Sequence, residues 1–93
     1  MDNKEILKEK NIVNEDIKSG NDKFLILHND EINTFDFVIE TLVDVCKHDS
    51  TQAEQCAWIT HYQGKCDIKK GQLSTLKPLK DEIIDRGLSV TID

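Results

Sequence analysis

The stretch Leu25-Ile-Leu-His-Asn-Asp-Glu31 changes from apolar to polar within a few residues. Phe24 and the first three residues of this stretch form a run of four apolar residues. In a strand, successive side chains point to opposite faces of the sheet. Apolar side chains on both faces predict a central strand from Lys23 to His28. The polar cluster that follows predicts a turn, because Asn and Asp side chains accept hydrogen bonds from nearby backbone amides.

Two helices are predicted after this turn. Apolar residues recur at helical spacing over Phe35–Cys46, and either Asn33 or Thr34 can cap the start of that helix. The sequence Thr51-Gln-Ala-Glu54 has the form of a capping box, which predicts a second helix that continues to about Tyr62. His61 therefore lies at the C-terminal end of the second helix.

The rest of the chain predicts two more strands and one more helix. Residues 65–69 alternate as a strand, and Lys70-Gly71 is expected to form a turn. A third helix is expected from about Thr75 to Asp85, with Pro78 acceptable only in its first turn. Residues 88–93 alternate as the last strand. The expected order is β-α-α-β-α-β, an α+β fold in which a three-stranded antiparallel sheet packs against three helices.

Length and charge limit the classes of protein. Residues 1–22 are polar and lack a clear apolar period, so we expect a flexible N-terminal extension before one folded domain over residues 23–93. Twelve Lys and Arg against eighteen Asp and Glu give a net charge of -6, which argues against nucleic-acid binding. Neither a signal peptide nor an apolar run of membrane-spanning length is present, so we expect a cytoplasmic protein with no membrane partner.

The cysteines do not form a recognisable disulfide or metal pattern. Cys46, Cys56 and Cys66 are an odd number without a C-x-x-C pair, which favours reduced thiols. Only Cys46 with His48 approaches the spacing of structural zinc ligands, so neither a metal nor a cofactor is expected. A zinc-dependent hydrolase remains an alternative that elemental analysis would test.

Three polar residues suggest a binding site. If the strand end and the helix end lie together, Asp30 and the Asn29 carbonyl could accept N–H groups of a cationic primary amine, and neutral His61 could accept one more. No Ser or Cys stands in a recognisable triad setting, so we expect no enzyme activity. The plainer alternative is that Asn29 and Asp30 only form a turn and that His61 only caps a helix end.

Two blocks of sequence resemble a known family. Residues Phe24-Leu-Ile-Leu-His-Asn-Asp-Glu-Ile-Asn-Thr-Phe-Asp-Phe-Val-Ile39 and Ala53-Glu-Gln-Cys-Ala-Trp-Ile-Thr-His-Tyr-Gln-Gly-Lys65 are similar to the ClpS family. The shared marks are an N-D-[DE] turn, a T-x-x-F-V helix start and a helix ending in H-x-x-G. Members of this family are adaptors that carry proteins with N-degrons to Clp ATPase-protease complexes.

The resemblance implies a function and a site. An N-terminal Leu, Phe, Tyr or Trp of a substrate would enter an apolar pocket, and the protein, expected to be a monomer, would deliver it to the N-terminal domain of a Clp-type AAA+ unfoldase. The substrate amine would be held at the pocket mouth by four polar residues, namely Asn29, Asp30, Glu31 and His61. The pocket wall would be formed by seven residues, namely Leu27, Asn33, Phe35, Val38, Ala57, Thr60 and Leu88.

Three wall positions depart from the family pattern. Phe35 and Ala57 stand where Met is usual, and Thr60 replaces an aliphatic residue and should make the wall more polar. The side-chain preference of the pocket is therefore expected to differ. These departures also leave open a second function, an interaction module that binds and modulates the Clp ATPase without reading N-termini.

Overall fold

The computed structural model describes residues 22–93, so the extension predicted over residues 1–22 lies outside the described residues except for its last position. Six elements follow one another: β1 (Lys23–His28), α1 (Phe35–Cys46), α2 (Ser50–Gln63), β2 (Lys65–Gly71), α3 (Leu73–Asp85) and β3 (Ser89–Ile92). The predicted α+β fold with the order β-α-α-β-α-β is confirmed.

The sheet is antiparallel and has the strand order β2-β1-β3. Strand β1 is central, as its two apolar faces predicted, and Leu25, Ile26 and Leu27 are all buried. His28 lies opposite Lys65 of β2 and opposite Ser89 of β3. The last residue of β1 and the first residues of both neighbouring strands therefore share one end of the sheet.

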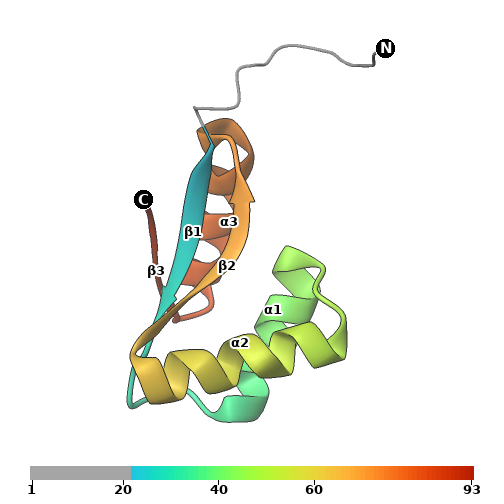
Figure 1. The fold of residues 1–93 in the computed structure, drawn as a ribbon, viewed down its shortest axis with the longest axis vertical. Coiled ribbons are helices and arrows are strands. Elements are labelled where there is room, and N and C mark those ends of the chain that lie inside the picture. Colours follow the sequence, from blue (N-terminus) through green and yellow to red (C-terminus); the bar gives the residue numbers. More distant parts are fainter. Residues whose placement is uncertain (1–21) are drawn as a thin grey trace, which may run out of the picture.

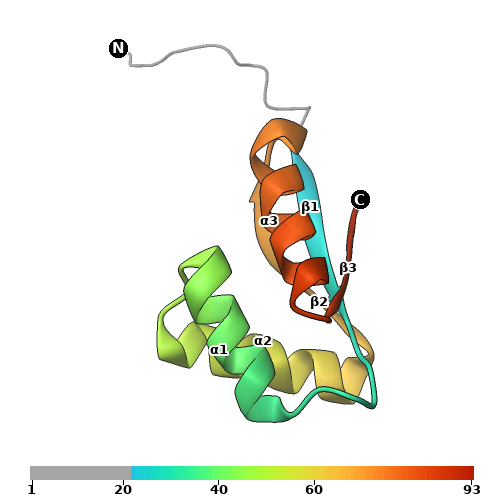
Figure 2. The same cartoon turned by 180° about the vertical axis from the view of Figure 1, so that it is seen from behind.

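The helices occupy two different places around the sheet. Helix α3 runs along one face of it, whereas α1 and α2 pack together near the end where β1 stops (Figures 1 and 2). The side chains of Leu25, Leu27, Leu42, Leu76 and Ile83 join these parts in one core and are at most 1% exposed. Each of them stabilises the fold by about 1.5–3 kcal/mol through burial.

The first two helices have N-caps of the expected chemistry, but one cap is a different residue. Thr34 caps α1 by accepting a hydrogen bond from the Phe37 backbone N–H. Helix α2 begins at Ser50 because Asp49 caps it, accepting from the Gln52 backbone N–H at 2.8 Å. The predicted capping box at residues 51–54 was therefore wrong, since an Asp two residues earlier satisfies the first turn.

The second half of the fold differs from the predicted boundaries at two places. Strand β2 continues through Gly71, which pairs with Lys23, so the turn expected at residues 70–71 is absent. Helix α3 begins at Leu73, and Pro78 therefore lies in its second turn rather than its first. Without an N–H on Pro78, the Ser74 carbonyl lacks its helical partner, and Ser74 is exposed so that water can replace it. Within residues 22–93, no helix is both long and apolar enough to cross a membrane.

Candidate functional site

Three connections of the chain meet at the end of the sheet where β1 stops. They are residues 29–34 before α1, Gly64 before β2 and residues 86–88 before β3. The Asn29 backbone N–H donates to the Gly64 carbonyl at 2.9 Å, which joins the first connection to the second. Gly64 has a φ of 94°, a conformation that favours glycine and ends α2 there. This turn brings His61, less than one helical turn before it, to the same end of the sheet as Asn29.

Asp30 organises the first connection as a tight turn. Its Oδ1 accepts hydrogen bonds from the Ile32 backbone N–H at 3.0 Å and from the Asn33 backbone N–H at 2.9 Å. Partial burial alone would raise the pKa of Asp30, but these bonds and one from the Asn33 side chain outweigh it and hold the pKa below its ordinary value. Asp30 is therefore a fixed carboxylate at the end of the sheet.

Asn33 ties the first connection to the third. Its Nδ2 donates to Asp30 Oδ2 at 3.0 Å and to the Gly87 carbonyl at 2.9 Å. Both amide hydrogens are then used, because a side-chain amide carries only two. Asn33, predicted as a wall residue from the family resemblance, thus also clamps the turn before α1 to the residue that precedes Leu88.

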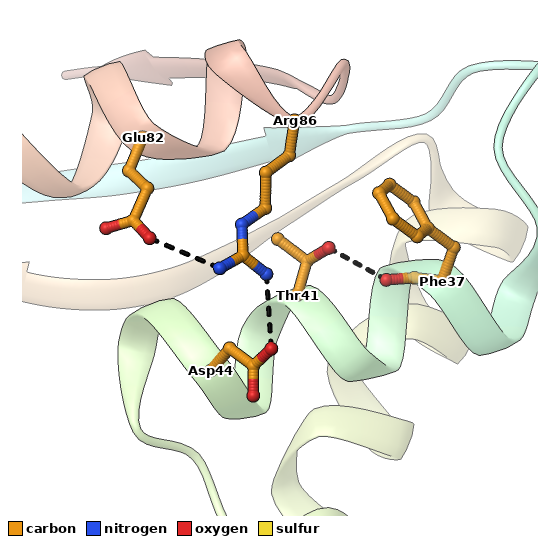
Figure 3. Close-up of polar contacts among 5 residues, drawn as sticks. All are labelled: Phe37, Thr41, Asp44, Glu82 and Arg86. Atoms are coloured by element: carbon orange, nitrogen blue, oxygen red, sulfur yellow. Dashed lines mark hydrogen bonds and ion pairs between the residues drawn. The ribbon is translucent and has the colours of Figure 1, made fainter.

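Arg86 reinforces the same corner from outside. Its guanidinium contacts Asp44 of α1 at 3.2 Å and Glu82 of α3 at 3.3 Å, so it bridges the two helices (Figure 3). On the same helix as Asp44, the buried Thr41 hydroxyl donates to the Phe37 carbonyl at 2.8 Å, so that its hydrogen bond is made within α1 (Figure 3). Partly exposed ion pairs contribute little to the free energy of unfolding. These two keep Arg86, and with it the start of the third connection, next to α1.

A small pocket opens at this corner. Its volume is about 50 Å³, and its lining residues come from β1, α1, α2 and the three connections. The lining residues are Leu27, His28, Asn29, Asp30, Asn33, Phe35, Val38, Ala57, Thr60, His61 and Leu88. The structure thus brings together ten of the eleven residues proposed for the site from the sequence and the resemblance.

The pocket has an apolar base and a polar mouth. Leu27, Ala57 and Leu88 are at most 4% exposed, whereas Asn29 and His61 are exposed and Asp30 is half-buried. Thr60 is buried, and its hydroxyl donates to the Cys56 carbonyl at 2.8 Å. The wall is less polar than Thr60 alone suggested, because that hydroxyl proton is already bound within α2.

One proposed residue lies outside the pocket and one pocket residue was missed. Glu31 is exposed in the turn and does not line the pocket. The Ile32 and Asn33 backbone N–H groups donate to Asp30 Oδ1, which closes the turn around Glu31 and leaves its side chain in solvent. His28 lines it and also contacts Thr91 of β3, with 2.7 Å between Nε2 and Oγ1. The sequence could have indicated His28 as a pocket residue, because it is the last residue of the predicted central strand, directly before the polar turn.

The cysteines are unsuited to nucleophilic chemistry. All three are buried, and burial raises the pKa of Cys46 to about 11 and that of Cys66 to about 12, so both are thiols at neutral pH. The Nε2 of the buried His48 contacts the Ile68 carbonyl at 2.7 Å, while its Nδ1 is buried without a hydrogen-bond partner. In the part of the chain that the structure describes, no three His, Cys, Asp or Glu side chains are grouped to hold a metal ion.

Comparisons with known proteins agree with this fold. The family model for the ATP-dependent Clp protease adaptor protein ClpS matches residues 20–91. Among solved structures, ClpS2 of Agrobacterium tumefaciens bound to L-phenylalaninamide has the same fold, with a TM-score of 0.67 and 18% sequence identity. The match covers 78% of this chain and 95% of that chain. No curated protein matches the sequence significantly.

The fold and the family model define the class to which this molecule belongs, the small α+β adaptors of ATP-dependent Clp proteases. The chain belongs to the ClpS family. This family is non-catalytic, and membership implies a Clp ATPase as partner.

Proposed function

We propose that this protein binds substrates whose free N-terminal residue is large and hydrophobic, and delivers them to a Clp-type AAA+ unfoldase. The observation that carries the proposal is one pocket with an apolar base beside a fixed carboxylate, an exposed amide and an exposed imidazole. The base would receive the first side chain, and Asn29, Asp30 and His61 would hold the α-amino group. The adaptor domain would span residues 23–93.

The mouth retains enough hydrogen-bonding capacity for an amine. Asp30 already accepts three hydrogen bonds, but an ionised carboxylate offers about four acceptor sites, so at least one remains. Its negative charge attracts the ammonium group even where the geometry of a direct bond is imperfect. Burying one Leu or Phe side chain contributes about 1.5–3 kcal/mol, and each charge-assisted bond adds about 1.5–3 kcal/mol at best.

A similar fold binds a ligand of this chemistry. The Agrobacterium ClpS2 structure holds L-phenylalaninamide, a molecule with a free α-amino group and an aromatic side chain. The family membership of this chain and the amine-compatible mouth both support the same class of ligand here.

The experiment is isothermal titration of the full chain with peptides that differ only in their first residue: Leu, Phe, Tyr, Trp, Ile or Ala. A free Phe-peptide should bind and its N-acetylated form should not, because acetylation removes the charge and two donors. Equal binding of both forms would overturn the proposal.

A matched pair of variants on α2 tests the imidazole. His61→Ala should weaken binding of the free Phe-peptide about two- to tenfold, since it removes one hydrogen bond to the amine. Gln63→Ala is the control, because Gln63 is exposed two residues later and does not line the pocket. Equal losses in the two variants would count against the role of His61.

The small volume of the pocket favours one alternative. About 50 Å³ admits a few water molecules, so a large side chain needs some movement of the wall. The alternative is an interaction module that binds and modulates the Clp ATPase without reading N-termini. Binding to the ATPase without binding to any of the six peptides would favour this module.

A further inference from the structure

Three aromatic rings form a continuous surface beside the pocket, which we call the aromatic shelf: Phe35, Trp58 and Tyr62. The rings of Trp58 and Tyr62 are stacked, with their centroids 5.0 Å apart and their planes 2° from parallel. Phe35 meets Trp58 edge-on with a centroid distance of 4.8 Å. Each geometry is one that aromatic pairs prefer, so the three rings support one another.

The shelf faces solvent. Trp58 is 44% exposed and Tyr62 is 70% exposed, although large aromatic side chains are usually among the more buried residues. They lie four residues apart on α2, which places them on the same side of the helix. The stacking holds them in place without covering them, and the structure therefore presents ring surface that no described residue covers.

The shelf is continuous with the pocket. Phe35 and His61 both line the pocket, and each of them also contacts a ring of the shelf. The rings of Phe35 and His61 meet edge-on, with their centroids 6.0 Å apart. The chain advances at most about 3.3–3.6 Å per residue, so the second residue of a peptide whose first side chain is in the pocket stays beside the shelf. A long, flexible side chain at that second residue can then fold back onto the rings.

Charge around the shelf favours a cationic side chain. Exposed Glu54 lies one helical turn before Trp58, on the same side of α2 as the shelf. Helix α2 contains no Lys or Arg, and the whole chain has a net charge of -6. Aromatic faces attract cations, Trp most strongly, and the flat guanidinium of arginine also stacks on them.

We propose that the aromatic shelf is a second recognition site, which binds the side chain of the substrate's second residue and prefers arginine there. This inference rests on the proposed function, because it requires the first residue to occupy the pocket. It makes Trp58 and Tyr62 specificity-determining residues, while the amine and the first side chain remain the primary determinants.

The test uses fluorescence anisotropy of the full chain with four free-amine peptides labelled at the C-terminus. One peptide begins Phe-Arg, and its matched partner begins Phe-Ala and carries the same arginine at position six. These two have identical composition and net charge, so their ratio of Kd values isolates the position of the arginine. Phe-Leu and Phe-Glu peptides complete the set.

The expected result is that the Phe-Arg peptide binds about two- to fivefold tighter than its partner, the size of an exposed cation–π interaction. Trp58→Ala and Tyr62→Ala should each reduce this ratio toward one. Ile84→Ala should leave the ratio unchanged, because Ile84 is similarly exposed, at 46%, but lies on α3. Circular dichroism of each variant establishes that it is folded.

Three outcomes would overturn the inference. They are equal affinity for the two matched peptides, a ratio that survives both shelf variants, or tightest binding of the Phe-Leu peptide. Failure of every free-amine peptide to bind would instead overturn the proposed function, and with it the shelf. The two failures are thus distinguished within one set of measurements.

Discussion

The pocket draws its walls from β1, α1, α2 and the residue before β3, whereas two of the three rings of the aromatic shelf come from a single helix. The pocket is held by hydrogen bonds between connections far apart in the sequence, such as that from Asn33 to Gly87. The shelf is held by stacking between residues one helical turn apart. Changes at the pocket should therefore alter stability and binding together, and changes at the shelf should alter binding with little effect on stability.

Filling the base of the pocket should have the largest effect. Ala57→Leu adds three carbon atoms at a position that is 3% exposed and lines the pocket. The larger side chain should fill the part of the pocket that we propose receives the first side chain of the substrate. We expect a loss of at least about tenfold in affinity for a Phe-peptide, equal to the 1.5–3 kcal/mol that burial of that side chain provides. Overpacking should also lower the free energy of unfolding by about 1–3 kcal/mol.

Isothermal titration and urea unfolding measure these two effects. Ala53→Leu is the control, because Ala53 is equally buried on α2 but does not line the pocket. It should destabilise the fold without a comparable loss of affinity in the folded protein. Unchanged affinity in Ala57→Leu would place the first side chain elsewhere.

Removing the charge of Asp30 should have an intermediate and pH-dependent effect. Because the pKa of Asp30 is lower in the folded protein, its ionisation stabilises the fold above the ordinary pKa of 3.8, and this stabilisation is lost as the pH falls through the folded value. Asp30→Asn replaces a charged acceptor of two backbone N–H groups by a neutral and weaker one, so at pH 7 we expect a free energy of unfolding about 1–2 kcal/mol lower than in the unaltered protein.

Urea unfolding at a series of pH values checks this sign. The two stability curves should approach each other as the pH falls below 3.8 and meet below the lower pKa of the folded protein, where both proteins carry an uncharged group at residue 30. Asp81→Asn, at an exposed position on α3, is the control. A difference between the curves that is constant with pH would contradict the role assigned to the charge.

The shelf should give the smallest effect on stability. Tyr62 is 70% exposed, so Tyr62→Ala should change the free energy of unfolding by no more than about 0.5 kcal/mol. Thermal unfolding followed by circular dichroism measures it. A loss above about 1 kcal/mol would show that the stack stabilises the fold, and the contrast between pocket and shelf would fail.

The fold was largely predictable from local patterns. The apolar run ending at His28 identified the central strand, and the helical period of residues 35–46 identified α1. The start of α2 was misplaced because Asp49 and Thr51 are both capable caps, and only the structure shows which backbone amide each can reach. The start of α3 was misplaced because Pro78 was allowed only in the first turn, although exposed carbonyls tolerate the missing N–H.

The candidate site was predictable where a residue type strongly prefers one local structure, such as Asn or Asp in a turn. Asn29, Asp30 and His61 followed from turn chemistry, a helix end and the family resemblance, and the structure brings them to one pocket mouth. Its use as an amine site stays a prediction. The clamp made by Asn33 could not be foreseen, because its partner Gly87 is 54 residues away. The shelf was missed although its four-residue spacing on α2 was visible, since exposure is set by packing.

The antiparallel register of β1 also fixes where the rest of the chain enters the domain. The six residues of this strand separate the pocket end of the sheet from residue 22, a distance of roughly 17–20 Å. Residue 22, where the described part of the chain begins, and the proposed amine site at His61 thus lie at opposite ends of the sheet. A fluorophore or affinity tag attached ahead of residue 22 is joined to the domain at the end remote from the pocket, which makes that end the place to label the protein for the binding measurements described above.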